Sequence, residues 1–117
     1  RWEAATSSLS YKPSLVEEFS DPEFALAFAL IENHYFINKG WFQTENQLID
    51  NIDKIRSIPS VIVQGRYDVV CPMKTAWELS EAWPEAEMII APSSGHTAFE
   101  KEITHALISA TDKFSSN

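Results

Sequence analysis

The chain has 117 residues, enough for one small domain, and 17 acidic against 9 basic side chains give it a formal charge of −8. This balance argues against nucleic acid or an anionic membrane as a partner, because both reward clustered Lys and Arg. No apolar run approaches the length of a membrane span and a single cysteine excludes an internal disulfide, so we expect a cytoplasmic protein.

A helix with clear start and stop signals is predicted over residues 22–39. Asp21 is a good N-cap, Pro22 suits the first helical position, and Gly40 suits the stop at the carboxyl end. Residues 24–31 carry no polar side chain. We therefore expect this helix to be packed on most of its sides.

Two less regular segments flank this helix. Residues 1–21 are expected to form a loop or linker with one helical turn. Residues 45–56 have Leu and Ile at helical spacing, which predicts a second helix. Residues 1–57 together are interpreted as part of a helical cap that covers the edge of a sheet.

A strand, a helix, a strand and a helix are predicted in turn over residues 58–117. The β-branched run 60–64 and the apolar run 87–91 indicate buried strands, and a helical pattern covers 73–82 between them. An amphipathic helix is expected over 103–114. This βαβα order implies parallel strands joined by a right-handed crossover, and hence an α/β fold.

The loop after each strand carries a side chain suited to catalysis. Asp68 follows the first strand in Gly-Arg-Tyr-Asp, and His96 follows the second in Ser-Gly-His. Because the carboxyl ends of parallel strands meet at one edge of a sheet, we expect the two side chains to lie near each other. An Asp that orients a His is the non-nucleophilic part of a Ser-His-Asp system, and the order fits an α/β-hydrolase. Each residue alone has a structural interpretation, as a cap or a turn, but the pair at matching strand ends favours catalysis.

The nucleophile of such a system is not found in the chain. Its glycines are Gly40, Gly65 and Gly95, so a Gly-x-Ser-x-Gly elbow does not occur. The first residue is Arg1 rather than Met, and we interpret the sequence as a piece of a longer protein with the nucleophile upstream. We expect this piece alone to be inactive and to need the remainder of the fold.

Glu32 is a further candidate on the predicted helix. Phe28 and Phe36 lie one helical turn to either side of it. A carboxylate among aromatic rings is costly unless it meets a cation or several donors. Either Glu32 lies at the helix edge, facing water or a protein cation, or it binds a cationic group of a substrate.

Other reactive side chains have simpler interpretations. Cys71 lies three residues after Asp68 and is expected to be a small buried residue near the site, not a nucleophile. His34 and His105 are expected at the surface or in packing. Three histidines this scattered predict no metal site, and we expect no cofactor.

Several motifs together resemble the prolyl aminopeptidase (proline iminopeptidase) family, α/β-hydrolase serine peptidases that remove an N-terminal proline from peptides. They are Ile-Glu-Asn-His-Tyr-Phe at 31–36, Val-Ile-Val-Gln-Gly-Arg-Tyr-Asp at 61–68, Ala-Trp-Pro-Glu-Ala-Glu at 82–87 and Gly-His at 95–96. The resemblance covers essentially the whole chain, although Leu30 stands where the family usually has Arg. It implies the carboxyl-terminal part of an α/β-hydrolase fold: a segment of the helical cap, then the last two parallel strands and their flanking helices.

The resemblance implies a role for five side chains. Asp68 is implied to be the triad acid and His96 the triad base. Glu3 and Glu32 are implied to hold the free α-ammonium of the substrate, and Phe36 to pack on its proline ring. The implied partners are a peptide with a free N-terminal proline and the remainder of the hydrolase core. Another α/β-hydrolase, such as an esterase or amidase, and a non-catalytic hydrolase-like fragment are the alternatives.

Overall fold

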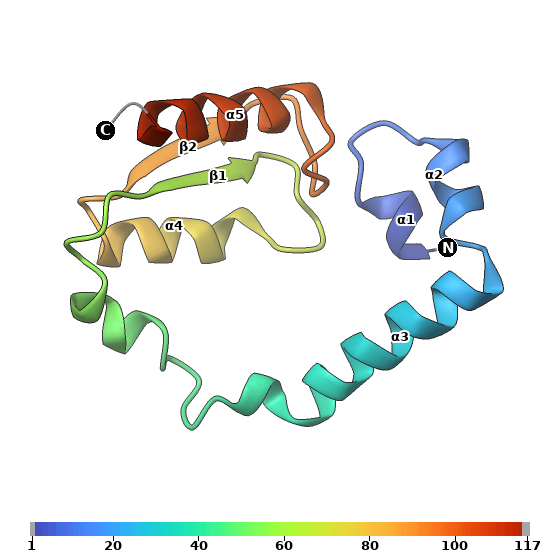
Figure 1. The fold of residues 1–117 in the computed structure, drawn as a ribbon, viewed down its shortest axis with the longest axis horizontal. Helices are drawn as coiled ribbons and strands as arrows, with labels where there is room; N and C mark the ends of the chain where they lie inside the picture. The colour runs from blue at the N-terminus through green and yellow to red at the C-terminus, as the bar shows by residue number, and fades with distance from the viewer. Residues whose placement is uncertain (1, 116–117) are drawn as a thin grey trace.

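A small parallel sheet lies between two helices, and a helical amino-terminal half extends from it (Figure 1). The structure is a computed structural model that describes residues 2–115. Strand β1 (Val61–Gly65) pairs in parallel with strand β2 (Glu87–Ala91). Helices α4 (Met73–Ala82) and α5 (Lys101–Ser115) lie on opposite faces of this sheet. The predicted βαβα order is confirmed, and it is consistent with part of an α/β-hydrolase.

The register of the strands brings their carboxyl ends level. Val61 lies opposite Glu87 and Gly65 lies opposite Ala91, so the loops that follow leave from the same edge of the sheet. The first strand begins one residue later than predicted. Ser60 lies just outside it, although its carbonyl oxygen still accepts a hydrogen bond from Glu87 N at 3.0 Å.

A hydrophobic cluster joins α4 to the segment that precedes β1. Its buried members are Ile52, Trp83 and Ala86, with Ile62, Leu79 and Ala82 packed against them. Trp83 Nε1 donates to the carbonyl oxygen of Arg56 at 3.3 Å, and the Arg56 Nη1 donates to both carboxylate oxygens of Glu85 at 2.9 and 3.0 Å. These contacts fix the turn between α4 and β2, and with it the position from which β2 runs to the site.

The described amino-terminal part contains three α-helices, α1 (Trp2–Thr6), α2 (Pro13–Glu18) and α3 (Pro22–Ile37), and a short 3-10 helix, η1 (Lys39–Trp41), after them. Asp21 caps α3, because its Oδ1 accepts two backbone N–H bonds of the first turn at 3.1 and 2.9 Å. The start predicted for this helix is confirmed. Its end falls two residues earlier than predicted, and the chain then turns through Gly40, whose φ is +59°.

Two predictions for the flanking segments were wrong. Of residues 1–21, expected to hold a single helical turn, 2–6 and 13–18 are helical. The helix expected over 45–56 is instead a stretch of turns that leads into a 3-10 helix, η2 (Ile49–Lys54). Its sequence of Ile, Asp and Asn has low α-helix propensity, so the apolar spacing alone was insufficient to predict an α-helix.

Helix α3 is exposed, contrary to the prediction that it is packed on most sides. Leu26, Leu30 and Ile31 are 63%, 60% and 62% exposed. Ring contacts of Phe24 and Phe28 with Phe19 stabilise its first turns, with centroids 5.0 and 5.7 Å apart. Trp41 contacts the rings of His34 and Tyr35 in the last turn of the helix, with centroids 5.2 Å apart in both pairs. The helix reaches away from the sheet (Figure 1), so the sheet and its helices do not cover its apolar surface.

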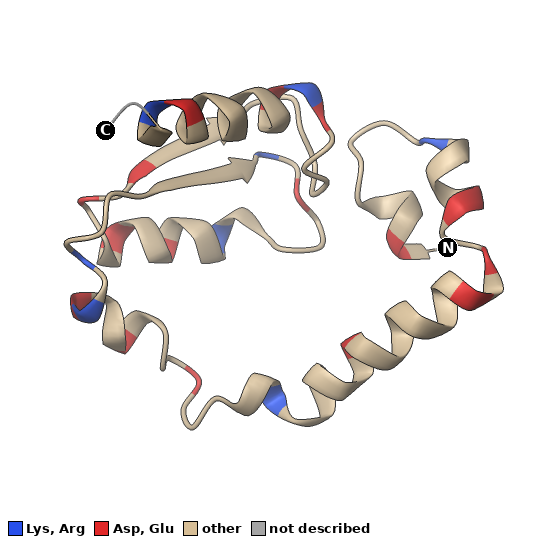
Figure 2. Ribbon diagram, in the orientation of Figure 1, with Lys and Arg blue, Asp and Glu red and all other residues tan. Residues whose placement is uncertain are grey.

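Charged side chains are distributed unevenly over the fold. Figure 2 shows Lys and Arg spread over the described chain without a basic cluster on any one element, while Asp and Glu recur on most helices. Within residues 2–115, no helix combines the length and apolarity needed to cross a bilayer. The contacts at the sheet edge determine which acidic side chains lie near His96.

Candidate active site

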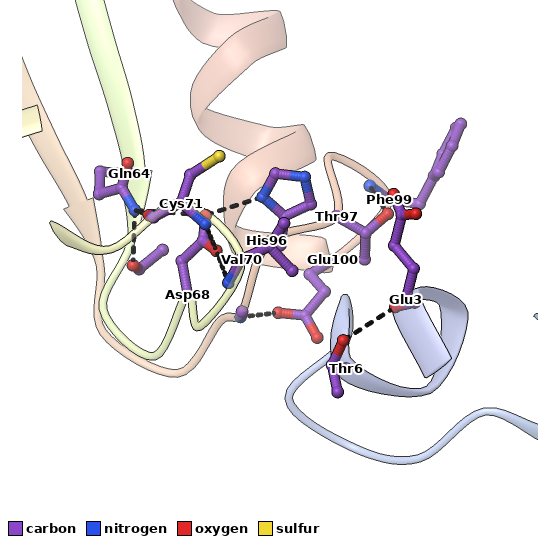
Figure 3. Close-up of polar contacts among 12 residues, drawn as sticks. Glu3, Thr6, Gln64, Asp68, Val70, Cys71, His96, Thr97, Phe99 and Glu100 are labelled. Carbon is purple, nitrogen blue, oxygen red and sulfur yellow. Dashed lines mark hydrogen bonds and ion pairs between the residues drawn. The ribbon is translucent and has the colours of Figure 1, made fainter. Parts of the chain in front are cut away.

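Asp68 is held in a tight turn directly after β1 (Figure 3). Its Oδ1 accepts backbone N–H bonds from Val70 at 2.9 Å and Cys71 at 2.8 Å. Gln64 Nε2 donates to the carbonyl oxygens of Gly65 and Cys71 at 3.2 and 3.1 Å, which ties the two ends of the turn together. The Asp68 side chain is only 6% exposed. Its carboxylate is therefore a fixed acceptor with one oxygen directed to another partner.

His96 supplies that partner from the loop after β2. Its Nδ1 lies 2.9 Å from Oδ2 of Asp68 (Figure 3). Because an ionised carboxylate only accepts, we infer that Nδ1 carries the proton and that Nε2 keeps a lone pair. The His96 side chain is 35% exposed, so it can be reached by a ligand. The two side chains thus meet at the sheet edge and form an Asp–His pair able to accept a proton.

The loops that carry this pair approach each other too closely for a side chain at the contact. A Cβ at Gly65 would lie 1.8 Å from the carbonyl oxygen of Gly95. Beside this contact, Tyr67 N donates to the carbonyl oxygen of Ser94 at 3.0 Å. Glycine at position 65 therefore allows the backbone bonds that hold the Asp68 turn against the His96 loop.

The His96 loop is also bonded to the segment after α1, which the sequence did not indicate. The backbone N–H of His96 and of the next residue each donate to the carbonyl oxygen of Ser7 at 2.8 Å. The Glu100 side chain accepts from Gly95 N at 2.5 Å and from Leu9 N at 2.6 Å. The only sequence signal for Glu100 was an acid just before a predicted helix, which indicates a helix cap equally well.

A cavity of about 330 Å³ lies between α1, α2, α3 and the His96 loop. Glu3 and His96 both line it, and Phe19, Phe28 and Phe99 contribute aromatic walls. One carboxylate, one imidazole and three rings thus face the same space. This combination suits a ligand that has an apolar body and a positive group.

Glu32 and Phe36 lie farther along α3. Glu32 is half-buried, and burial, followed by the charge of Glu3, raises its carboxyl pKa above the ordinary value. The two carboxylates are thus close enough to repel each other. Phe36 is 72% exposed. The structure brings Glu3 and His96 to one cavity and places Glu32 close enough to Glu3 for electrostatic repulsion between the two carboxylates. Phe36 lies at the surface.

We expect the free energy of unfolding to fall as the pH rises through the folded-state pKa of Glu32. This pKa is raised, so the folded state binds the proton more tightly than the unfolded chain and loses that advantage on ionisation. Glu32→Gln should therefore stabilise the protein at about pH 7 and lose this effect at about pH 4. Urea midpoints of both proteins at the two pH values test this, and an equal difference at both would contradict it.

The remaining reactive side chains have no direct part in the pair. Cys71 is exposed rather than buried, contrary to the prediction. Partial desolvation, followed by the charge of Asp68, raises the pKa of its thiol, which keeps it protonated at neutral pH and weakly nucleophilic. His34 and His105 are exposed, as predicted. Among the described residues, no cluster of His, Cys, Asp and Glu is suited to a metal ion.

Known proteins are similar to this chain over almost all of its length. A probable proline iminopeptidase of Leptolyngbya boryana is 58% identical over 97% of this chain. The proline iminopeptidases of Xanthomonas citri and Arabidopsis thaliana are 55% and 51% identical over the same share. The chain spans about a third of the length of these relatives, namely 35%, 36% and 30%.

A family model described as TAP-like protein, of the α/β-hydrolase class, matches residues 15–114. The match includes both strands, helices α3, α4 and α5, and the loops that carry the Asp–His pair. The chain belongs to this TAP-like family of α/β-hydrolases.

Proposed function

We propose that this chain is the carboxyl-terminal part of a cytoplasmic serine aminopeptidase that releases N-terminal proline from peptides. The observation that carries the proposal is the 2.9 Å contact between His96 Nδ1 and Asp68 Oδ2, at the carboxyl ends of two parallel strands. Function in open α/β sheets gathers at this edge. The names of the relatives, proline iminopeptidases, favour this substrate over other acyl compounds.

In this mechanism Asp68 and His96 act on a serine from the remainder of the hydrolase core. The serine hydroxyl attacks the carbonyl carbon of the proline residue while His96 Nε2 takes its proton. The imidazolium that forms is stabilised by Asp68, and it then gives the proton to the leaving amine. Water releases the proline from the acyl-enzyme by the same two proton transfers.

Glu3 and Glu32 are the proposed ligands of the α-ammonium of the substrate. Burial, followed by the charge of Glu3, raises the pKa of Glu32, and a cation beside the Glu32 carboxylate would offset both effects. An ammonium held there admits only the first peptide bond to His96. Phe36, one turn beyond Glu32, is the proposed contact for the proline ring, and its exposed side chain is open to a ligand.

We assign residues 1–57 to the helical cap and 58–117 to the hydrolase core. Among the described residues, α3 leaves apolar surface exposed and each of the two strands has one unpaired edge, and these are surfaces that a larger fold would cover. The missing core would also supply the nucleophile and the oxyanion hole. By this assignment, residues 1–117 alone should show no peptidase activity.

The test compares two substrates with the full-length protein: proline linked to a chromogenic amine, and the same compound with an acetylated nitrogen. We expect cleavage of the free-amine compound only. Equal cleavage of both would indicate another amidase or esterase and remove the ammonium role. Cleavage of neither would favour a non-catalytic protein.

Glu32→Gln in the full-length protein should lower kcat/KM for the free-amine substrate by about thirtyfold or more, because a charge partner of the ammonium is lost. Glu23→Gln is the matched control, since Glu23 lies on the same helix and is exposed in its first turn. It should leave kcat/KM within about twofold. A similar loss in both variants would argue against an ammonium site at Glu32.

A further inference from the structure

Glu100 is a buried acid that joins two distant parts of the chain. Its carboxylate is the acceptor for Gly95 N, at 2.5 Å, and for Leu9 N, at 2.6 Å. Gly95 belongs to the His96 loop, and Leu9 belongs to the segment after α1, 91 residues before Glu100. The residue is only 9% exposed. A carboxylate that accepts from two backbone amides in a buried place is a strong, directional clamp.

The clamp is part of a continuous seam between these segments. Beside it, the backbone N–H of His96 and Thr97 both reach the carbonyl oxygen of Ser7 at 2.8 Å. A Cβ at Gly95 would lie 2.9 Å from Leu9 N and 3.2 Å from Ser7 O, so the two backbones are already in close contact. The seam therefore allows little sliding of one segment along the other.

The seam also borders the cavity that Glu3 and His96 share. Ser7 and Thr97, which bond to each other across the seam, both line this cavity. Glu3 lies on α1, one helical turn before Ser7, and Ser7 N donates to the Glu3 carbonyl oxygen at 2.9 Å. A shift of one segment against the other would thus change the separation between the Glu3 carboxylate and the His96 imidazole.

We infer that Glu100 is a positioning residue that sets the spacing between Glu3 and His96, and so determines how a substrate held by its positive end meets the catalytic base. The inference rests on the proposed function for the role of Glu3. A displacement of about 1 Å in such a site can cost about a hundredfold in rate. Glutamine at position 100 has about the same volume as glutamate but only one acceptor oxygen, so its NH2 group would face one of the two backbone amides. Two donors that face each other cannot bond, and this would open the seam without a change in side-chain volume.

A matched control is available two residues after Glu100, in the first turn of α5. Glu102 holds the same loop, since its Oε2 accepts from Ser93 N at 2.8 Å and from Ser94 Oγ at 3.1 Å. These contacts stay within the loop and its helix. Glu102→Gln therefore perturbs a loop-anchoring carboxylate without loosening the connection to α1.

The experiment measures kcat/KM of the full-length protein and both variants on two substrates, proline linked to a chromogenic amine and a small uncharged aryl ester. Glu100→Gln should lose about tenfold or more on the proline substrate and no more than about threefold on the ester. Glu102→Gln should stay within about threefold on both. Equal losses on the two substrates in Glu100→Gln, or no loss, would overturn the inference.

Hydrogen exchange tests the clamp without activity. Protection of the Leu9 and Gly95 amides should fall in Glu100→Gln and persist in Glu102→Gln, and unchanged protection would refute the clamp. If the wild type cleaves the ester but not the proline substrate, the proposed function fails, and exchange alone decides whether Glu100 holds the seam. If Glu100→Gln does not fold, Gly95→Ala wedges the same seam from the other side and should show the same selective loss.

Discussion

Asp68→Asn in the full-length protein should lower kcat on a proline chromogenic substrate by about ten-thousandfold, the loss seen when the acid of a Ser-His-Asp triad becomes an amide. The oxygen of the amide stays with the N–H groups of Val70 and Cys71, so its NH2 group faces His96 Nδ1, which must then accept. The proton of the ring therefore moves to Nε2, and in the proposed mechanism Nε2 can then no longer take the proton of the serine. The measurement is kcat under saturating substrate.

The fold should remain intact in Asp68→Asn, so the loss of kcat can be distinguished from a general loss of structure. Asparagine keeps a carbonyl oxygen that can accept from the amides of Val70 and Cys71, the bonds that shape the turn. The control is Asp53→Asn, because the Asp53 side chain is 89% exposed and paired only at the surface with Arg56, at 3.0 Å. It should leave kcat within about twofold. Near-normal turnover of Asp68→Asn would remove Asp68 from the triad.

The placement of this pair could be predicted because it depends on local pattern and simple topology. The run at 60–64 is β-branched and that at 87–91 is apolar, both are bounded by turn residues, and a helical pattern separates them. The parallel pairing of β1 and β2 then brings Asp68 and His96 to one edge. Nothing beyond the order of the elements was needed for that step.

The seam at Glu100 could not be predicted in the same way. One of its two donors, Leu9 N, lies 91 residues before Glu100, in a segment interpreted as a loop. A helix-capping acid and an acid that clamps two backbones have the same local sequence. Only the folded chain distinguishes them, because the distinction lies in which distant amide is near.

For helix α3 the sequence predicted packing that the structure does not show, whereas at Glu100 the structure shows a contact that the sequence did not predict. Its apolar sequence predicted dense packing, yet Leu26 and Leu30 are 63% and 60% exposed in the described chain. An apolar pattern indicates that a helix surface is to be buried, but it does not identify the residues that bury it. We propose that the remainder of the hydrolase core is that partner.

Gly65→Ala should destabilise the protein by about 3 kcal/mol or more, because the added Cβ would overlap backbone rather than a movable side chain. It would lie 1.8 Å from the carbonyl oxygen of Gly95 and 2.9 Å from that of Ser94. Neither loop can yield without breaking the bond between Tyr67 N and Ser94 O. The change therefore separates the Asp68 turn from the His96 loop, and activity should fall with stability.

Gly40→Ala is the control that separates this overlap from the general cost of losing a glycine. Gly40 has a φ of +59°, so alanine there is strained, but its Cβ would meet only the Phe42 ring, at 3.1 Å. A flexible side chain can move aside, and we expect a loss of about 1 kcal/mol with normal activity. Urea unfolding of both variants gives the comparison. If Gly65→Ala were no less stable than Gly40→Ala, the close approach of the two loops would not be a feature of the protein in solution, and the Asp68–His96 contact that depends on it would lose its support.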